Sequence, residues 1–439
     1  VMKLSTYLFK PIDNTPIALW RIVFGSVLFF ETWGAIAVGW VKQVYIDPPL
    51  FTFNFIGFEF LQPLPPYGMY AWFGLLGIFS LGVIFGYRYR LSILLLTIGW
   101  LGVYLMHKTS YNNHHYLMTL LCLMMCVVPA HKAVSLDAKS GRTSPLSVCY
   151  NLYLQLFVWL FLIVFFYAAI AKVYPDWLTG TPLTQWLSYK KDSAIGFLYQ
   201  SDFQALLMSW GGIIFDLFVI PALLWKPTRK YAFWISVYFH IMNSITFQIG
   251  TFPYLMIGAC VLFYPADKLR KWFKIKHKHS TELPLPTPIF AKFALTLFIV
   301  FYAVQLLLPL RHYAIPGNVF WTEEGHRLSW RMMLRSKTGS AVFHITKPDG
   351  TKLIRDAKAD MTYKQYRTMA THPDMVWQYC QFLKEQYTDS CHIKAYVDVS
   401  LNFRKPQPLI DPNYNMAKAE WHLFKHAEWI TAGPTWDDE

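Results

Sequence analysis

Three polar clusters interrupt the apolar segments of this 439-residue chain, and they carry the side chains best suited to chemistry. Lys172 ends an apolar run that begins near residue 148. The string 108–116 contains adjacent asparagines and adjacent histidines, and the string 238–244 places His240 and Asn243 three residues apart, on one helix face. Desolvation favours the neutral form of an amine, which can then accept a proton as a base. The clusters therefore predict a site that deprotonates a substrate.

Each cluster also has a purely structural interpretation. Lys172 could place its ammonium among lipid headgroups at the mouth of a membrane helix. Asn112 or Asn113 could cap a helix, and the histidines could bond to neighbouring carbonyls. Convergence of all three clusters at one depth favours a polar pocket in an apolar bundle, because ionisable groups inside a membrane are costly. Such a pocket suits a lipophilic substrate that must lose a proton, and a quinol is the obvious candidate.

The composition is that of a polytopic membrane protein with some soluble mass, since 54% of residues are hydrophobic and 15% are charged. The formal net charge is +14, but the basic residues lie between apolar runs, so nucleic-acid binding is not expected. The six cysteines lack metal-site spacing with histidines, and no metal is expected. Cys380 and Cys391 could form a disulfide if they lie in an oxidising compartment, which the sequence leaves open.

The fold class predicted is a polytopic α-helical membrane protein, with about nine transmembrane helices and a C-terminal extracytoplasmic α+β soluble domain. A bilayer is crossed by about 17–25 apolar residues in a helix. The runs of this kind are 16–38, 68–87, 91–107, 114–130, 148–172, 204–225, 230–247, 251–265 and 291–309.

Lysine and arginine are unevenly divided between alternate connections, sixteen in one set and five, including Lys191, in the other. Because basic connections stay in the cytoplasm, this predicts a cytoplasmic N-terminus and an external C-terminal tail. We therefore expect a transmembrane helical domain over 1–309, with a cytoplasmic linker at 266–290, and an extracytoplasmic domain over 310–439. The aromatic connection 39–67 is expected to lie along the outer interface.

The tail alternates between strand and helix signals. The segments 341–346 and 351–355 flank a Pro-Asp-Gly turn and predict a hairpin. Strict alternation over 393–403 predicts a further strand, and 361–387 is expected to be helical with a break at Pro373. The tail therefore predicts a small α+β module.

Six stretches, in order, resemble the vitamin K-dependent gamma-carboxylase family, whose membrane part is called the horizontally transferred transmembrane domain. They are Leu19-Trp20-Arg21 with Phe24-Gly25, residues 61–65, 108–114, 171–177, 238–244 and 329–333. The resemblance implies that vitamin K hydroquinone, or menaquinol in a bacterium, is the co-substrate together with O2 and CO2. The quinol would leave as its 2,3-epoxide, while a glutamate-containing peptide or protein becomes γ-carboxylated.

The resemblance also implies residue roles. Lys172 matches the amine base, Asn113 and His114 match residues that hydrogen-bond the quinone oxygens, and His240 matches a further site histidine. We assign substrate binding to seven further residues: Tyr111, Asn243, Trp321, His326, Trp330, Met332 and Met333. Of these, Trp330, Met332 and Met333 form an apolar cluster expected to face the membrane pocket. No carboxylate follows Lys172 before Asp176, so we expect no ion pair that would hold its proton.

Departures from the family pattern qualify these roles. Residues 39–67 contain no cysteine for the disulfide that animal members form with the soluble domain, and this, with the short N-terminus, fits a bacterial inner-membrane homologue with a periplasmic tail. Ala171 replaces a lysine that commonly precedes the base, which removes a neighbouring positive charge. The segment 321–326 differs from the family's glutamate-binding segment. Two alternatives therefore stay open: a quinol epoxidase or oxygenase without glutamate carboxylation, and a non-catalytic quinone-binding or transport protein. The inverted repeats and broken spans typical of transporters are not evident.

Overall fold

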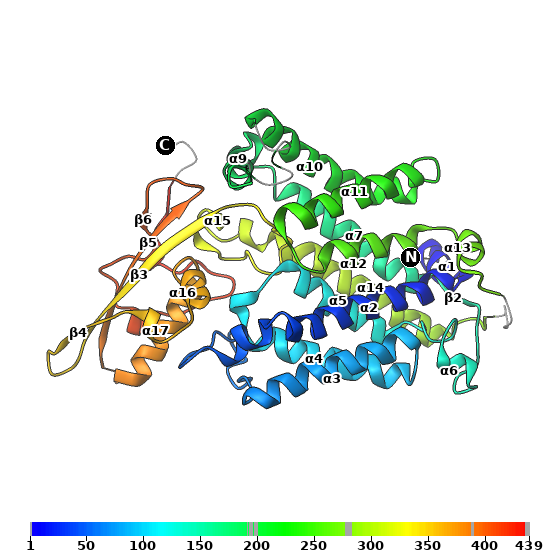
Figure 1. Cartoon of the computed structure of the whole chain (residues 1–439), viewed down its shortest axis with the longest axis horizontal. Helices are drawn as coiled ribbons and strands as arrows, with labels where there is room; N and C mark the ends of the chain where they lie inside the picture. Colours follow the sequence, from blue (N-terminus) through cyan, green and yellow to red (C-terminus); the bar gives the residue numbers. More distant parts are fainter. Residues whose placement is uncertain are drawn as a thin grey trace.

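The computed structural model describes residues 2–434 except 191, 193–195, 197–200, 277–282, 388 and 389. Lys191 and the middle of the expected linker 266–290 lie outside the described residues. The chain forms a bundle of long helices with an α+β part at one end of it (Figure 1).

Helices are present at all nine positions where the sequence predicts spans. They are α2 (Thr15–Ala37), α3 (Pro66–Phe85), α4 (Tyr89–Met106), α5 (Asn113–Val127), α7 (Asn151–Ile170), α10 (Asp202–Leu224), α11 (Arg229–Phe247), α12 (Phe252–Ala259, continued by a 3-10 helix to Phe263) and α14 (Pro288–Leu307). Within the described residues, six are long and apolar enough to cross a membrane: α2, α3, α4, α7, α10 and α14. The protein is therefore a multi-pass membrane protein, while the span count of nine stays a prediction.

The outer surface of the bundle is apolar, as contact with lipid requires. On α14, for example, Phe298 and Tyr302 are buried against the bundle, while Phe293, Val300 and Leu307 are exposed. A soluble protein rarely exposes such a continuous apolar surface.

Short elements gather at the end of the bundle away from the α+β part (Figure 1). They are α1 (Met2–Leu8), strand β1 (Pro11–Asp13), which pairs with β2 (Val148–Tyr150), α6 (Leu136–Lys139) and α13 (Ala266–Phe273). Arg270 forms an ion pair with Asp13, so the N-terminal segment and α13 are held together. The connections expected to be basic and cytoplasmic thus share one end of the bundle, as the sequence predicts.

The α+β part contains one four-stranded antiparallel sheet with the order β4-β3-β5-β6. Its elements are β3 (Lys337–Thr346), β4 (Lys352–Arg355), β5 (His392–Leu401), β6 (Gln407–Pro408), α16 (Tyr363–Met369) and α17 (Pro373–Tyr387). The predicted hairpin, the predicted strand and the helix break at Pro373 are all confirmed. Cys380 and Cys391 are buried in this core, and the described residues form no disulfide.

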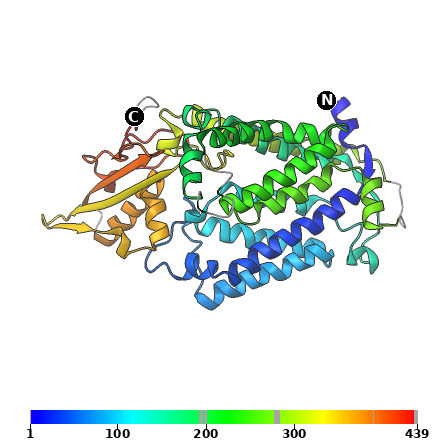
Figure 2. The ribbon, with the colours of Figure 1, turned by 45° about the horizontal axis from the view of Figure 1, so that its top comes forward.

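The connection after α2 runs between the helical bundle and the α+β part, as both Figure 1 and Figure 2 show. It contains a π-helix over Lys42–Ile46, and its Phe53 is fully buried in the core of the α+β part. The side-chain amides of Gln365 and Gln378 donate to the carbonyls of Phe51 and Asn54 at 2.9 and 3.1 Å. The aromatic residues of this connection are therefore packing residues between the two parts.

Two short helices after α7, α8 (Pro175–Leu178) and α9 (Thr181–Ser188), and α15 (Val319–Thr322) complete the same junction. Tyr174 packs on Phe320 with 4.4 Å between ring centroids. The residues of the candidate site lie near this junction, because Lys172 is two residues before Tyr174.

Candidate active site

Lys172 is buried, with its amine inside the protein. It lies in the turn after α7, and its Nζ donates to the carbonyl of Ala168 at 3.0 Å. The same Nζ lies 2.6 Å from Oδ2 of Asp216 on α10, and the two side chains are only 11% and 8% exposed. A lysine that extends to lipid headgroups would be exposed, so the structure does not favour the anchoring interpretation.

The expectation that Lys172 forms no ion pair is wrong. Its partner, Asp216, does not follow Lys172 closely in the chain but is supplied by a different helix that packs against α7. Asp176, the nearest carboxylate in sequence, instead accepts hydrogen bonds from Arg404 at 2.6 and 2.9 Å and from Asn402 at 2.7 Å. Asp176 therefore joins the helical bundle to the α+β part.

Two histidines lie among aromatic side chains close to this pair. His114 at the start of α5 stacks on Phe252, with 4.0 Å between ring centroids. His240 on α11 is 2% exposed and contacts Phe252, Phe215 and Phe165. Since Phe215 adjoins Asp216 in the chain, these rings connect the Lys172–Asp216 pair with both histidines.

The histidine nitrogens lack protein partners. Among the described residues, nothing hydrogen-bonds to Nδ1 of His114 or to either ring nitrogen of His240. Buried polar groups in proteins are nearly always hydrogen-bonded, so unpartnered nitrogens in an apolar pocket indicate a ligand or water. Aromatic walls with a few polar groups are typical of sites for lipophilic rings, and a quinol fits this set of donors and acceptors.

Asn113 and Tyr111 hold a segment of the α+β part against the bundle. The amide of Asn113 donates to the carbonyl of Arg331 at 2.9 Å, and its Oδ1 accepts from Tyr111 at 3.2 Å. The Tyr111 oxygen accepts from the backbone N–H of Leu328 at 2.8 Å. Asn112 caps α5 through a 2.8 Å bond from His115 N, which confirms the capping interpretation for that residue. The assigned ligand contacts of Asn113 and Tyr111 stay predictions.

The segment 328–333 enters the bundle with a strained backbone. Leu328, Trp330 and Met333 have positive φ values of 60°, 57° and 47°, which are uncommon for residues other than glycine. Trp330 is fully buried and stacks on Tyr116 of α5 at 4.7 Å, and Met332 packs against the same core. Met333 is 41% exposed. Trp330 and Met332 thus pack against the membrane bundle.

The other assigned binding residues are more dispersed. Trp321 is buried in the core of the α+β part, where its indole N–H donates to Thr431 at 3.1 Å. Asn243 is half-buried, about one turn along α11 from His240. His326 is enclosed by charged side chains, and burial, with Arg335 nearby, lowers its pKa well below the usual value. His326 is therefore neutral at pH 7.

Arg331 is a buried cation without a carboxylate partner among the described residues. Its side chain lies over the ring of Phe320 at 4.3 Å, and its Nη1 is 3.4 Å from His312 Nε2. Its Nε has no hydrogen-bond partner. Burial and the nearby Arg335 lower the pKa of Arg331 to about 10, so it stays charged at neutral pH. An unpaired buried guanidinium is suited to a carboxylate ligand.

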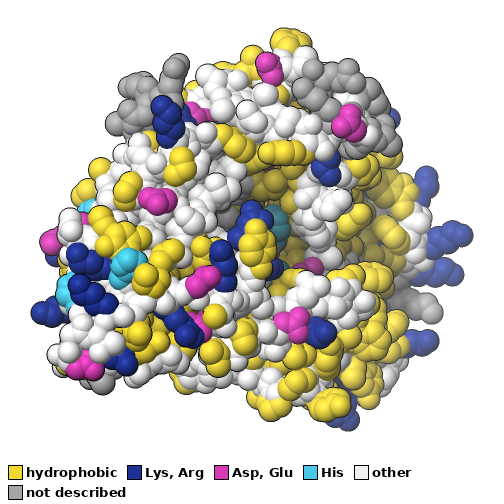
Figure 3. Space-filling model, turned by 60° about the vertical axis from the view of Figure 1, so that its left-hand side comes forward, with side chains coloured by type: hydrophobic (Ala, Val, Ile, Leu, Met, Phe, Trp, Pro, Cys, Tyr) yellow, Lys and Arg dark blue, Asp and Glu magenta, His cyan; other side chains and the backbone are white. Residues whose placement is uncertain are grey.

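The cations near Arg331 already have a protein carboxylate. Arg335 and Lys337 both pair with Glu323, Lys337 at 3.1 Å. Figure 3, with the α+β part turned forward, shows a hollow near the middle of this face, with Lys or Arg and His side chains at it. Among the described residues, no group of three His, Cys, Asp or Glu side chains could hold a metal ion.

Sequence reasoning missed three residues of this region: Asp216, Arg331 and Glu31. Asp216 and Glu31 are single carboxylates within apolar runs, and an ionisable residue inside a membrane span is a functional candidate by default. That signal was sufficient to select both. Arg331 lies within the stretch 329–333, of which only the apolar residues Trp330, Met332 and Met333 were assigned to substrate binding.

Two protein-family models match the chain. Residues 9–268 match the HTTM domain model. Residues 290–435 match the model described as vitamin K-dependent gamma-carboxylase, lumenal domain. No solved structure matches the chain significantly.

Proposed function

The chain belongs to the vitamin K-dependent gamma-carboxylase family, and from that premise we propose that it is an integral-membrane quinol-dependent carboxylase. It takes vitamin K hydroquinone or menaquinol, O2, CO2 and a glutamate side chain. The products are the 2,3-epoxide, γ-carboxyglutamate and water, with release of one proton. The observation that carries the proposal is a buried amine, Lys172, paired with Asp216, whose neighbour Phe215 packs on His240. Both ring nitrogens of His240 lack hydrogen-bond partners among the described residues.

Lys172 acts as the base, and the Asp216 carboxylate, whose Oδ2 lies 2.6 Å from Nζ, positions its amine. When the quinol O–H bond breaks, the free amine of Lys172 takes up the proton in a new N–H bond, and the quinol becomes an anion. The carboxylate of Asp216 stabilises the ammonium that forms. Asp216 thus orients the amine and helps to retain the proton.

His114 and His240 bind and orient the quinol. Their nitrogens without partners can hydrogen-bond the ring oxygens, and Phe215 and Phe252 provide apolar contacts for the ring. Burial of the anion near hydrogen-bond donors stabilises negative charge more strongly than water does.

Arg331 receives the carboxylate of the substrate glutamate. A guanidinium offers two parallel N–H groups to a carboxylate, and Arg331 has no competing protein carboxylate among the described residues. Asn113 holds the Arg331 backbone at 2.9 Å and directly precedes His114 in the chain. The glutamate and the quinol would therefore be positioned by one connected segment.

A quinol epoxidase without glutamate carboxylation is the second candidate. It is favoured by the pairing of Arg335 and Lys337 with Glu323, which leaves these two cations unavailable to a substrate carboxylate. Under this alternative the protein forms the epoxide but fixes no CO2.

The test incubates purified protein with vitamin K hydroquinone, labelled bicarbonate and a glutamate peptide, and measures epoxide and fixed label separately. Lys172→Ala and Lys172→Arg should both lose epoxide formation, because a guanidinium stays charged and cannot accept the proton. Lys358→Ala, at an exposed site, is the matched control. A small amine should partly restore Lys172→Ala. Near wild-type epoxidation by folded Lys172→Arg would exclude Lys172 as the base.

We further propose a bacterial inner-membrane location with a cytoplasmic N-terminus and a periplasmic α+β part. Lys139 ends α6 and Lys358 lies between β4 and α16, and both are exposed. In Figure 1, α6 and the pair β4 and α16 lie at opposite ends of the molecule. An impermeant thiol reagent should label Lys358→Cys in intact spheroplasts and Lys139→Cys only after lysis. The reverse pattern would invert the orientation.

A further inference from the structure

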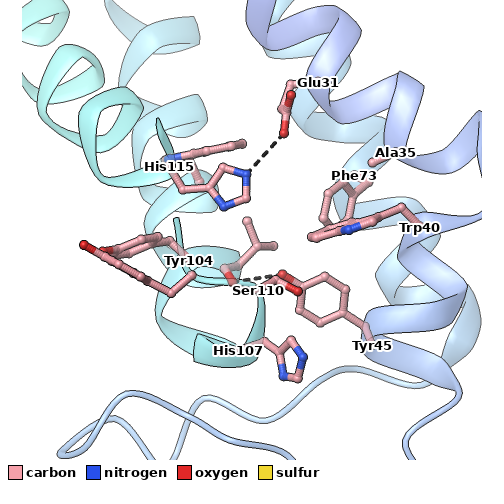
Figure 4. A pocket seen from close by; sticks show the side chains of 12 residues that line it. Glu31, Ala35, Trp40, Tyr45, Phe73, Tyr104, His107, Ser110 and His115 are labelled. Atoms are coloured by element: carbon pink, nitrogen blue, oxygen red, sulfur yellow. Dashed lines mark hydrogen bonds and ion pairs between the residues drawn. The ribbon is translucent and has the colours of Figure 1, made fainter. Parts of the chain in front are cut away.

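A second polar pocket lies between α2, α3, α4 and α5, next to His115 (Figure 4). Its aromatic walls are Trp40, Tyr45, Phe73, Trp100 and Tyr104, and its polar lining is Glu31, His107, Ser110, Tyr111 and His115. In Figure 4, Glu31 and His115 face each other on one side, and His107 lies on the opposite side near Tyr45.

Glu31 connects this pocket with the wall of the candidate active site. One carboxylate oxygen lies 3.2 Å from His115 Nε2, and the other accepts from the Thr251 hydroxyl at 2.5 Å. Thr251 precedes Phe252, the ring that stacks on His114. A half-buried carboxylate with a histidine partner therefore lies between the two sites.

Two polar atoms of the pocket lack partners. His107 is 4% exposed, and its Nδ1 has no hydrogen bond among the described residues. The hydroxyl of Tyr104 is likewise buried without one. With Glu31 and His115 they surround a cavity of about 30 Å³, more than the roughly 10–15 Å³ that one water requires. The cavity is polar enough and large enough for water, and too small for an organic ligand.

The pocket leads toward the face that carries the α+β part. His107 and Ser110 belong to the connection between α4 and α5, and Lys364 of α16 donates to the Ser110 hydroxyl at 3.1 Å. Lys364 also lies over the Trp40 ring at 5.9 Å. Water in the pocket would thus extend from Glu31 to the junction between the bundle and the α+β part.

We propose that this pocket holds ordered water and carries the proton released by carboxylation from the active site to that face. The proposal rests on the proposed function, in which replacing a glutamate C–H by a carboxylate releases one proton. The proton passes from the His114 wall to the Glu31–His115 pair, then to pocket water, and leaves past His107. At each step one O–H or N–H bond breaks and another forms.

Hydration is tested first, without using activity. Tyr45 and Tyr89 are both buried, and of the two Tyr45 lines the pocket. X-ray radiolytic footprinting forms hydroxyl radicals from bound water, so mass spectrometry should find Tyr45 oxidised at least tenfold faster than Tyr89. Equal rates would show that the pocket is dry and would overturn the proposal.

The proton route is tested with Glu31→Gln, which keeps the size of the side chain but cannot accept a proton. Turnover of label fixation should fall at least tenfold, with KM for the quinol within twofold. Glu31→Asp, which keeps a carboxylate, should retain much of the turnover. Thr251→Val removes a contact to Glu31 but keeps its carboxylate, so turnover should stay well above that of Glu31→Gln. Exposed Glu59→Gln is the matched control.

Two results would overturn the proton route. One is normal turnover in folded Glu31→Gln. The other is an equal loss of turnover in Glu31→Asp with a raised KM for the quinol, which indicates a structural role. Failure of the proposed function is distinguishable, because the wild type itself would then fix no label. In that case faster oxidation of Tyr45 would still support the water site, while the proton role would be excluded.

Discussion

Asp374 is the carboxylate that two cations from different parts of the molecule share. Its Oδ2 lies 2.5 Å from Lys108 Nζ, at the start of the polar string before α5, and 2.7 Å from Arg327 Nη1. Lys108 and Asp374 are each only 2% exposed. Burial raises the pKa of Asp374, but Arg327 and Lys108 together lower it well below its usual value. Asp374→Ala would therefore leave two buried cations without a counterion.

The expected cost follows from this burial. Removing one partner of a buried ion pair destabilises a structure by about 3–5 kcal/mol, because a charge is left uncompensated. At about 1.4 kcal/mol for each factor of ten, local opening at this junction becomes roughly 100- to 4,000-fold more frequent. The nearest reporter is the backbone N–H of Leu328, which donates to Tyr111 at 2.8 Å and adjoins Arg327.

Hydrogen exchange of the 327–333 peptide, followed by mass spectrometry in nanodiscs, measures this opening. Asp356→Ala is the matched control, since Asp356 only caps a short 3-10 helix through a 3.0 Å bond from Lys358 N. Exchange that changes by less than tenfold in Asp374→Ala, or that equals the control, would refute the reasoning.

The pH dependence has a defined sign. A carboxylate with a lowered pKa contributes stability above its ordinary value, about 3.9, and loses it as pH falls toward the lowered value. The opening equilibrium that Asp374 controls, obtained from the exchange rates, should therefore be constant from pH 5 to 8. It should increase only below about pH 4.

Three further predictions concern single residues. Asp216→Asn should lower kcat for epoxidation about tenfold or more with little change in quinol KM, because the amine loses its orienting carboxylate. Asp216→Glu should recover part of the lost kcat, and an equal loss of kcat in both variants would contradict the orienting role. Arg331→Gln should raise KM for the glutamate peptide about tenfold or more, since a charged hydrogen bond is worth about 1.5–3 kcal/mol. The KM for the quinol should change far less, and parallel changes in the two KM values would exclude carboxylate binding by Arg331. Burial lowers the pKa of His372 to about 4, so the unfolded chain binds the proton more readily and stability is lost as pH falls from about 6.5 to 4. Thermal unfolding of His372→Gln should show a shallower loss over this range, and an unchanged slope would count against it.

The sequence by itself determined the elements and their arrangement along the chain. Helices appear at all nine apolar runs, because run length and apolar composition are local properties. The hairpin forms where Pro348, Asp349 and Gly350 predict a turn, and α17 begins at Pro373, where the missing N–H is tolerated. The uneven distribution of lysine and arginine placed the basic connections at one end of the bundle. The candidate residues Lys172, His114 and His240 were also selectable, because polar groups in apolar runs are costly.

Only the tertiary structure decided the partners of those residues. Lys172 pairs with Asp216, 44 residues away, and not with Asp176, four residues away. Asn113 bonds to Arg331 across 218 residues. Hydropathy and periodicity specify which face of a helix is polar, but a pair forms only when two helices pack at a particular depth and rotation. That packing depends on side-chain shape along the whole contact between helices. A buried charge in the sequence therefore predicts that a partner exists, while the fold selects which one it is.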